Sequence, residues 1–121
     1  MAKILTVDDA ALMRRIIKTT LRRAGYTEIY EATDGIQALE KYNLIKPNLV
    51  LMDITMPNLN GLEALKAIRA ADPGANVVMC TAMGQESMVV EAIRSGAKDF
   101  IVKPFKPERL LNMVATIIGN P

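Results

Sequence analysis

The sequence predicts an α/β fold in which a parallel sheet is covered by helices on both faces. Short apolar segments rich in β-branched residues alternate along the chain with longer segments of helical periodicity. Most of the short segments are hydrophobic nearly throughout, as expected for strands buried on both faces. Regular alternation implies right-handed crossovers between parallel strands. At 121 residues, the chain is expected to be a single domain, residues 1–121, without a second output domain.

Five segments are predicted to be strands. The second, residues 28–32, mixes charged and apolar residues and is therefore expected at an edge of the sheet. The predicted strands are Ile4–Val7, Glu28–Ala32, Leu49–Met52, Val77–Thr81 and Phe100–Val102.

Apolar residues at three- and four-residue spacing predict a helix after each strand. Gly25 and Gly96 are placed to end the first and fourth helices, while Pro47 and Pro73 stop the second and third. Pro107 stands where a first-turn proline is favoured, at the start of the fifth helix. The apolar helix positions are Met13, Ile16, Ile17, Thr20, Leu21 and Ala24; Ile36, Leu39 and Tyr42; Leu62, Leu65 and Ile68; Met88 to Ile93; and Leu110, Leu111, Val114, Ile117 and Ile118.

The composition restricts the chemistry and the location of the protein. The chain has no histidine and only one cysteine, Cys80, which excludes triads with histidine and the usual zinc sites. Cys80 is expected to be a small buried hydrophobe. A net charge of +2 is too small to predict binding to nucleic acid or to an anionic membrane. No apolar run reaches the ~20 residues of a membrane span, so a cytoplasmic protein is expected.

Polar side chains collect at the carboxyl ends of the predicted strands. Asp8 and Asp9 follow the first strand, Asp53 the third and Lys103 the fifth, while Thr81 ends the fourth. Open α/β sheets bind ligands at this edge, so these side chains are expected to converge. Clustered carboxylates repel one another unless a cation is present, and an all-oxygen ligand set favours a hard cation such as Mg²⁺. The alternative for the two consecutive acids is capping of the following helix.

Several short motifs, in order and at strand ends, are those of a known family. The sequence resembles a response-regulator receiver domain of the CheY type over its whole length. The resemblance implies a flavodoxin-like (βα)5 fold with a doubly wound parallel sheet in the order 2-1-3-4-5. The motifs are Val7-Asp8-Asp9, Met52-Asp53-Ile54-Thr55-Met56-Pro57, Gly61, Thr81-Ala82 and Lys103-Pro104-Phe105.

The resemblance implies a phosphorylation site with Mg²⁺ as its cofactor. Asp53 resembles the phospho-acceptor, which attacks a phosphohistidine to form an acyl phosphate. The metal is implied to be held by Asp9, by Asp53 and by the backbone carbonyl of Thr55, and through a water molecule by Asp8. A metal and a cationic side chain would offset the charge of an anionic nucleophile that approaches an anionic phosphoryl group.

The resemblance also implies residues that assist phosphoryl transfer and residues that change conformation after it. Lys103 would supply the cationic side chain, and Thr81 would turn inward to hydrogen-bond a phosphoryl oxygen; their alternatives are a solvated lysine and an ordinary strand threonine. Phe100 stands where many chemotaxis members carry a switching tyrosine, and its alternative is a plain core residue. Met83 is expected to shield the acyl phosphate. The Lys103–Pro104 bond resembles the family's cis peptide.

The resemblance also implies an output surface on the fourth helix, fifth strand and fifth helix. Met88 and Val90 are expected to be partly exposed there, whereas Val89 and Ile93 are expected to face inward. A solvated basic face with buried methionines is the alternative. The predicted output surface comprises Met88, Val90, Lys98, Lys106 and Arg109.

The expected function is a stand-alone, monomeric signalling switch, and not an enzyme acting on another substrate. The resemblance favours chemotaxis, with a CheA-type histidine kinase upstream and a flagellar motor switch protein downstream, and it allows a separate phosphatase. A phosphorelay intermediate is the alternative within signalling. A flavodoxin-like electron carrier is disfavoured because Asp8 and Asp9 would repel a flavin phosphate. An aspartyl phosphatase is disfavoured because Asp53-Ile54-Thr55 lacks a second acid.

Overall fold

Five parallel strands form one sheet in the order β2-β1-β3-β4-β5 in the computed structural model, which describes residues 2–121. This order and the strict alternation of strands and helices confirm the predicted fold. Three strands are one residue longer than predicted, because Lys3, Asp53 and Asp99 also pair in the sheet. The strands are β1 (Lys3–Val7), β2 (Glu28–Ala32), β3 (Leu49–Asp53), β4 (Val77–Thr81) and β5 (Asp99–Val102).

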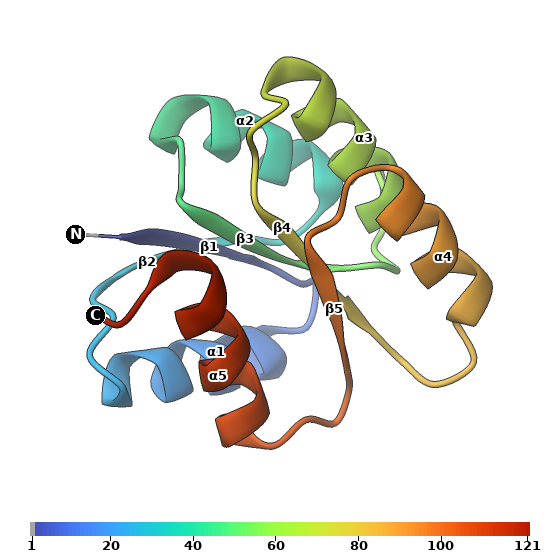
Figure 1. The fold of residues 1–121 in the computed structure, drawn as a ribbon. Helices are drawn as coiled ribbons and strands as arrows, with labels where there is room; N and C mark the ends of the chain where they lie inside the picture. The colour runs from blue at the N-terminus through green and yellow to red at the C-terminus, as the bar shows by residue number, and fades with distance from the viewer. Residues whose placement is uncertain (1) are drawn as a thin grey trace.

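Helices cover both faces of the sheet, with α2, α3 and α4 on one face and α1 and α5 on the other (Figure 1). Each helix layer packs on one of two apolar clusters, which together enclose the sheet. The helices are α1 (Ala11–Arg23), α2 (Gly35–Ile45), α3 (Gly61–Ala71), α4 (Glu86–Arg94) and α5 (Pro107–Ile118).

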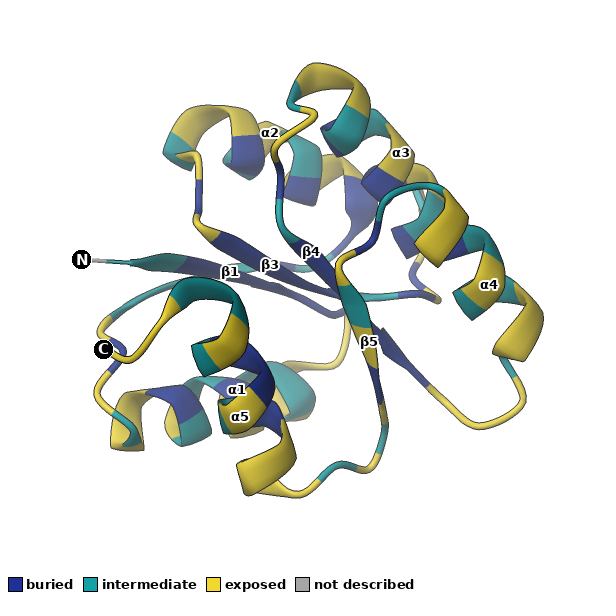
Figure 2. Cartoon of the chain, in the orientation of Figure 1, coloured by how far each residue is buried: buried dark blue, intermediate teal, exposed yellow. Residues whose placement is uncertain are grey.

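Burial follows the predicted pattern along the strands. The central strands are buried, and the outward surfaces of the helices are exposed (Figure 2). Strand β2 lies at one edge, and four of its five residues are only partly buried, as its mixed sequence indicates. Cys80 in β4 is 2% exposed and belongs to the core, as expected. Within residues 2–121, no helix is both long and apolar enough to cross a membrane.

Local signals define where the helices begin. The Asp34 side chain caps α2 by accepting a hydrogen bond from the Gln37 amide at 2.8 Å. Asn60 caps α3 in the same way through the Glu63 amide at 2.9 Å. Pro107 occupies the first turn of α5, where its missing N–H leaves no helical hydrogen bond unmade. These starts fix where each chain segment leaves the carboxyl edge of the sheet.

Candidate functional site

Three carboxylates converge at the carboxyl ends of β1 and β3, as predicted. One oxygen each from Asp8, Asp9 and Asp53 lies within 4.8 Å of the others. The strands are adjacent and in register, so residues that follow Val7 and Met52 emerge side by side. Helix capping does not explain the two consecutive acids, because the N-cap residue of α1 is Ala10.

Lys103 extends from the end of β5 into this acid cluster. Its Nζ donates to Asp8 Oδ2 at 2.8 Å and lies 3.3 Å from Asp53 Oδ1. Its side chain is 19% exposed, so the alternative of a solvated lysine is wrong. Burial lowers the pKa of Lys103, but its hydrogen bond to Asp8 and the charge of Asp53 outweigh burial and raise the pKa overall. The lysine therefore remains a cation.

The surroundings of Asp53 disfavour its negative charge. Burial raises its pKa, the positive charge of Lys103 opposes this, and the negative charges of Asp8 and Asp9 raise it further. The net direction is upward, so one cation does not offset burial and the neighbouring acids together.

The acid cluster fits a divalent cation. Three carboxylates and one ammonium leave a formal charge of −2 (−3 plus +1) on the ionised groups. Opposite ligands of octahedral Mg²⁺ stand about 4.2 Å apart, since each bond is about 2.1 Å long. The three carboxylate oxygens lie within 4.8 Å of one another, which is on the scale of one magnesium ion and its directly bound ligands and water. Charge, ligand type and spacing thus agree with a hard cation.

The loop between β3 and α3 is held tightly against Asp53. A Cβ atom at Gly61 would come within 2.0 Å of the Asp53 carbonyl oxygen, so only glycine fits there. The Gly61 amide donates to the Ile54 carbonyl at 2.7 Å. Asn58 has a φ of 65° and donates to the Asp34 side chain at 2.7 Å, which ties the loop to α2. The backbone around the predicted phospho-acceptor is therefore fixed by its neighbours.

Thr81 is buried at the end of β4, and its hydroxyl faces a residue that sequence reasoning missed. The Oγ1 atom lies 3.0 Å from the Ala82 carbonyl oxygen and 3.0 Å from Gln85 Oε1. Gln85 Oε1 also accepts from the Ala82 amide at 2.7 Å, and its Nε2 donates to Thr55 Oγ1 at 2.7 Å. The only sequence signal for this contact was the position of Gln85, whose carboxamide comes four residues after the threonine that ends β4.

An apolar groove of about 800 Å³ lies between α4 and β5. Val90 and Phe100 line it and are 50% and 36% exposed, so Phe100 is not the plain core residue of the alternative interpretation. Its side chain forms part of an open surface instead. Lys98 and Lys106 are exposed, as predicted.

One prediction on α4 is wrong and another is confirmed. Ile93 is 44% exposed and lines the groove, whereas it was expected to face inward. Met88 is partly exposed, as expected; it packs against the core on the side of α2 and α3 and does not line the groove. Ile93 is exposed because the neighbouring Ala92, which is itself 1% exposed, marks the side of α4 that meets the sheet. Ile93 is rotated by about 100° from Ala92, and this turns it outward.

Two smaller predictions concern loops at this edge. The Lys103–Pro104 peptide bond is cis, in agreement with the resemblance. Met83 is 85% exposed, so its side chain extends into solvent and does not lie packed over the acid cluster as a shield.

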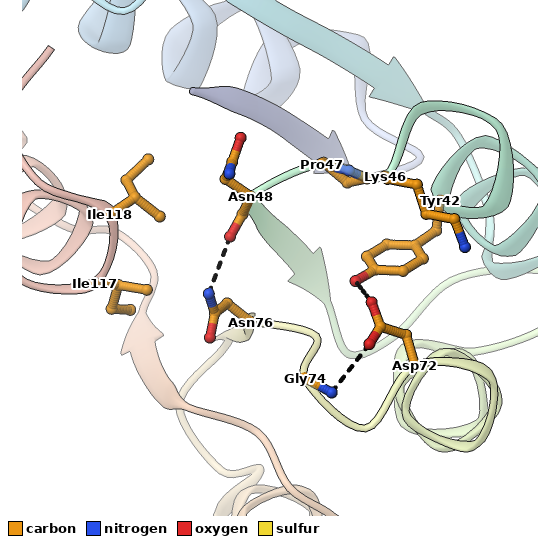
Figure 3. A pocket seen from close by; sticks show the side chains of 9 residues that line it. All are labelled: Tyr42, Lys46, Pro47, Asn48, Asp72, Gly74, Asn76, Ile117 and Ile118. Atoms are coloured by element: carbon orange, nitrogen blue, oxygen red, sulfur yellow. Dashed lines mark hydrogen bonds between the residues drawn. The ribbon is translucent and has the colours of Figure 1, made fainter. Parts of the chain in front are cut away.

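A polar hollow of about 320 Å³ lies at the opposite, amino edge of the sheet (Figure 3). The Tyr42 hydroxyl donates to Asp72 at 2.7 Å, and the Gly74 amide donates to the same carboxylate at 3.0 Å. Both bonds hold the pKa of Asp72 below its usual range. Asn76 donates to the Asn48 carbonyl at 3.1 Å. These groups satisfy one another, which is typical of a structural contact between elements.

Comparison with known proteins identifies the family. The protein-family model described as the response regulator receiver domain matches residues 4–115 of this chain. The chain belongs to this family. A chemotaxis protein CheY from Thermotoga maritima is 54% identical over 109 residues, which cover 90% of this chain and 91% of that protein. CheY from Bacillus subtilis is 54% identical over 112 residues, covering 93% of each chain.

Solved structures agree with this assignment. The receiver domain superimposes with a TM-score of 0.91 on a chain of the CheX–CheY–BeF3–Mg²⁺ complex from Borrelia burgdorferi. That match is 33% identical and covers 96% of this receiver domain and 88% of that chain. The protein is thus a CheY-like response regulator.

Proposed function

We propose that this receiver domain is phosphorylated on Asp53 and that the modification changes its affinity for a partner. The convergence of Asp8, Asp9 and Asp53 around the ammonium of Lys103 carries the proposal. An Asp53 carboxylate oxygen attacks phosphorus and forms a P–O bond. The P–N bond to the phosphohistidine donor breaks, and the histidine leaves as a neutral imidazole whose freed nitrogen carries a proton taken from solvent.

The other groups of the site bind the metal, offset negative charge or donate a hydrogen bond during this transfer. Mg²⁺ would be held by Asp9, Asp53 and the Thr55 carbonyl, and through water by Asp8, and when bound it offsets negative charge on the phosphoryl oxygens. Lys103 offsets that charge directly with its ammonium. Thr81 carries no charge, unlike the carboxylates and the lysine, and its hydroxyl donates a hydrogen bond to a phosphoryl oxygen after transfer.

The proposed pathway is chemotaxis, because relatives at 54% identity are chemotaxis proteins. A CheA-type histidine kinase would supply the phosphoryl group in the cytoplasm, and a flagellar motor switch protein would bind the phosphorylated domain. The groove lined by Val90, Ile93 and Phe100 is the surface we assign to output. A separate phosphatase is also proposed, since a structural neighbour was solved in complex with CheX. The domain itself acts as a monomeric switch and promotes only its own phosphorylation and dephosphorylation.

The test uses Mg²⁺ and acetyl phosphate, followed by intact mass measurement. The wild type is expected to gain one phosphoryl group, and Asp53→Asn none. Asp99→Asn is the matched control, because Asp99 lies at the opposite end of β5 from Lys103, and it should be modified like the wild type. Equal modification of Asp53→Asn would refute the proposal. Back-transfer from the phosphorylated protein to a histidine phosphotransfer domain, with no binding to a motor component, would assign it to a phosphorelay instead.

A further inference from the structure

One side chain, Gln85, connects the two loops that border the acid cluster. The Ala82 amide can only donate, so the Gln85 atom 2.7 Å from it must be the carboxamide oxygen. The carboxamide nitrogen then faces Thr55 and donates to its hydroxyl at 2.7 Å. Thr55 lies in the loop after β3 and Ala82 in the loop after β4, and both loops can be followed in Figure 1. The glutamine thus links the segment that follows Asp53 to the segment that follows Thr81.

The hydroxyl of Thr81 has a single hydrogen to donate. Its two nearby acceptors are Gln85 Oε1 and the Ala82 carbonyl oxygen, each 3.0 Å away. The proposed function requires the same hydrogen to point at a phosphoryl oxygen on Asp53. The contact with Gln85 and the contact with a phosphoryl group therefore exclude each other.

We propose that Gln85 is a positioning residue that holds the Thr81 hydroxyl in the unphosphorylated arrangement and that must release it when Asp53 is phosphorylated. This inference rests on the proposed function. Hydrogen bonds made in only one of two states favour that state by their own free energy. The bond that Thr81 donates to Gln85 thus opposes switching, and the bonds of Gln85 with Ala82 and Thr55 hold its carboxamide in place to accept that bond.

The position of Gln85 also connects this release to the output groove. Gln85 is the N-cap residue of α4, and its carbonyl accepts from the Met88 and Val89 amides at 3.1 and 3.0 Å. Val89 lines the groove between α4 and β5. A change at the Gln85 side chain therefore acts on the first turn of the helix that forms one wall of the groove.

The test compares Gln85→Met with the wild type. Methionine keeps the length of the side chain and removes its hydrogen bonds. Binding of beryllofluoride in the presence of Mg²⁺, measured by calorimetry, reports the phosphoryl-like state. Gln85→Met is expected to bind beryllofluoride about threefold to tenfold more tightly, because the one bond from Thr81 that switching must break contributes about that factor. Gln37→Met is the matched control, since Gln37 accepts from the Thr33 amide at the start of α2, and its affinity should be unchanged.

A second variant separates positioning from general destabilisation. Thr55→Val removes the other end of the same link and should tighten binding less than Gln85→Met does. The double variant should match Gln85→Met alone, because both changes break one connection. Gln85→Met should also lower the melting temperature of the free protein while it strengthens beryllofluoride binding. A lower melting temperature with unchanged or weaker binding would mean a merely structural role and would overturn the inference.

Measurements on the wild type distinguish failure of the proposed function from failure of the inference about Gln85. If the wild type neither gains a phosphoryl group from acetyl phosphate nor binds beryllofluoride, the proposed function fails and this inference with it. If the wild type does both and Gln85→Met binds no more tightly, only the role of Gln85 is refuted.

Discussion

Replacing Lys103 with methionine is expected to destabilise the metal-free protein by about 2 to 3 kcal/mol. The substitution keeps most of the side-chain volume but removes the only ammonium that the structure places against Asp8 and Asp53 within residues 2–121. Asp8 is 2% exposed, so its charge would lose a partner that solvent cannot readily replace.

The magnitude follows from two close ion pairs and the burial of the lysine. Pairs at 2.8 and 3.3 Å each contribute about 5 to 6 kcal/mol of attraction at an effective dielectric constant of about 20. Loss of water by the ammonium offsets much of this, and removing one partner of a buried pair costs about 3 to 5 kcal/mol. The Lys103 and Asp53 side chains retain 19% and 13% exposure, so water relieves part of the loss.

Urea unfolding at pH 7 in the presence of EDTA measures this change. The Lys103→Met protein should also melt about 10 °C lower. Addition of Mg²⁺ should stabilise it more than it stabilises the wild type, because the cation then offsets a more negative cluster. Lys98→Met, at an exposed position just before β5, is the control and should behave like the wild type. A Lys103→Met protein within about 0.5 kcal/mol of the wild type in EDTA would refute this account of the acid cluster.

Three further predictions concern stability away from the acid cluster. The Thr6 hydroxyl is fully buried and has no hydrogen-bond partner among residues 2–121, so Thr6→Val should stabilise the protein by about 1 kcal/mol in urea unfolding; destabilisation would show that the hydroxyl is satisfied. Tyr42→Phe should cost about 1 kcal/mol by the same assay through loss of the bond to Asp72, and an unchanged midpoint would contradict this. The Lys18 hydrogen bond lowers the pKa of Glu31, so this carboxylate stabilises the fold above its unfolded pKa and loses that effect as pH falls through the folded value. Glu31 is 36% exposed, so Glu31→Gln should cost under about 1 kcal/mol at pH 7, with a difference that disappears in acid; an equal difference at both pH values would exclude the ion pair as its cause.

The sheet and the acid cluster were predictable because both depend on short-range patterns. Apolar segments of strand length identify the strands, and parallel pairing then places all their carboxyl ends at one edge. Once β1 and β3 are placed as neighbours, the convergence of Asp8, Asp9 and Asp53 follows from parallel pairing without any detail of side-chain geometry. The strand order itself came from the family resemblance, since composition and spacing do not specify it.

The orientation of α4 and the contacts of Gln85 were not predictable in the same way. Met88, Val89, Val90 and Ile93 are all apolar, so the local pattern allows several rotations of the helix. Packing of Ala92 against the sheet selects one of them. Gln85 meets Thr55 only after two loops have folded, and the two residues are 30 positions apart in sequence. Such a contact depends on tertiary geometry and leaves little signal in the sequence.

The charge of the site explains why its neutral donors matter for switching. Under the proposed function, phosphorylation replaces a carboxylate of charge −1 by a phosphoryl group of charge about −2, in a site that already carries −2 with its lysine included. A divalent cation and Lys103 can offset that charge, and both are attracted to the acids before and after transfer. The Thr81 hydroxyl is different, because its one hydrogen is shared between Gln85 Oε1 and the Ala82 carbonyl oxygen in one state and points to the phosphoryl group in the other. The difference in free energy between the two states therefore depends directly on the strength of the contacts made by Gln85.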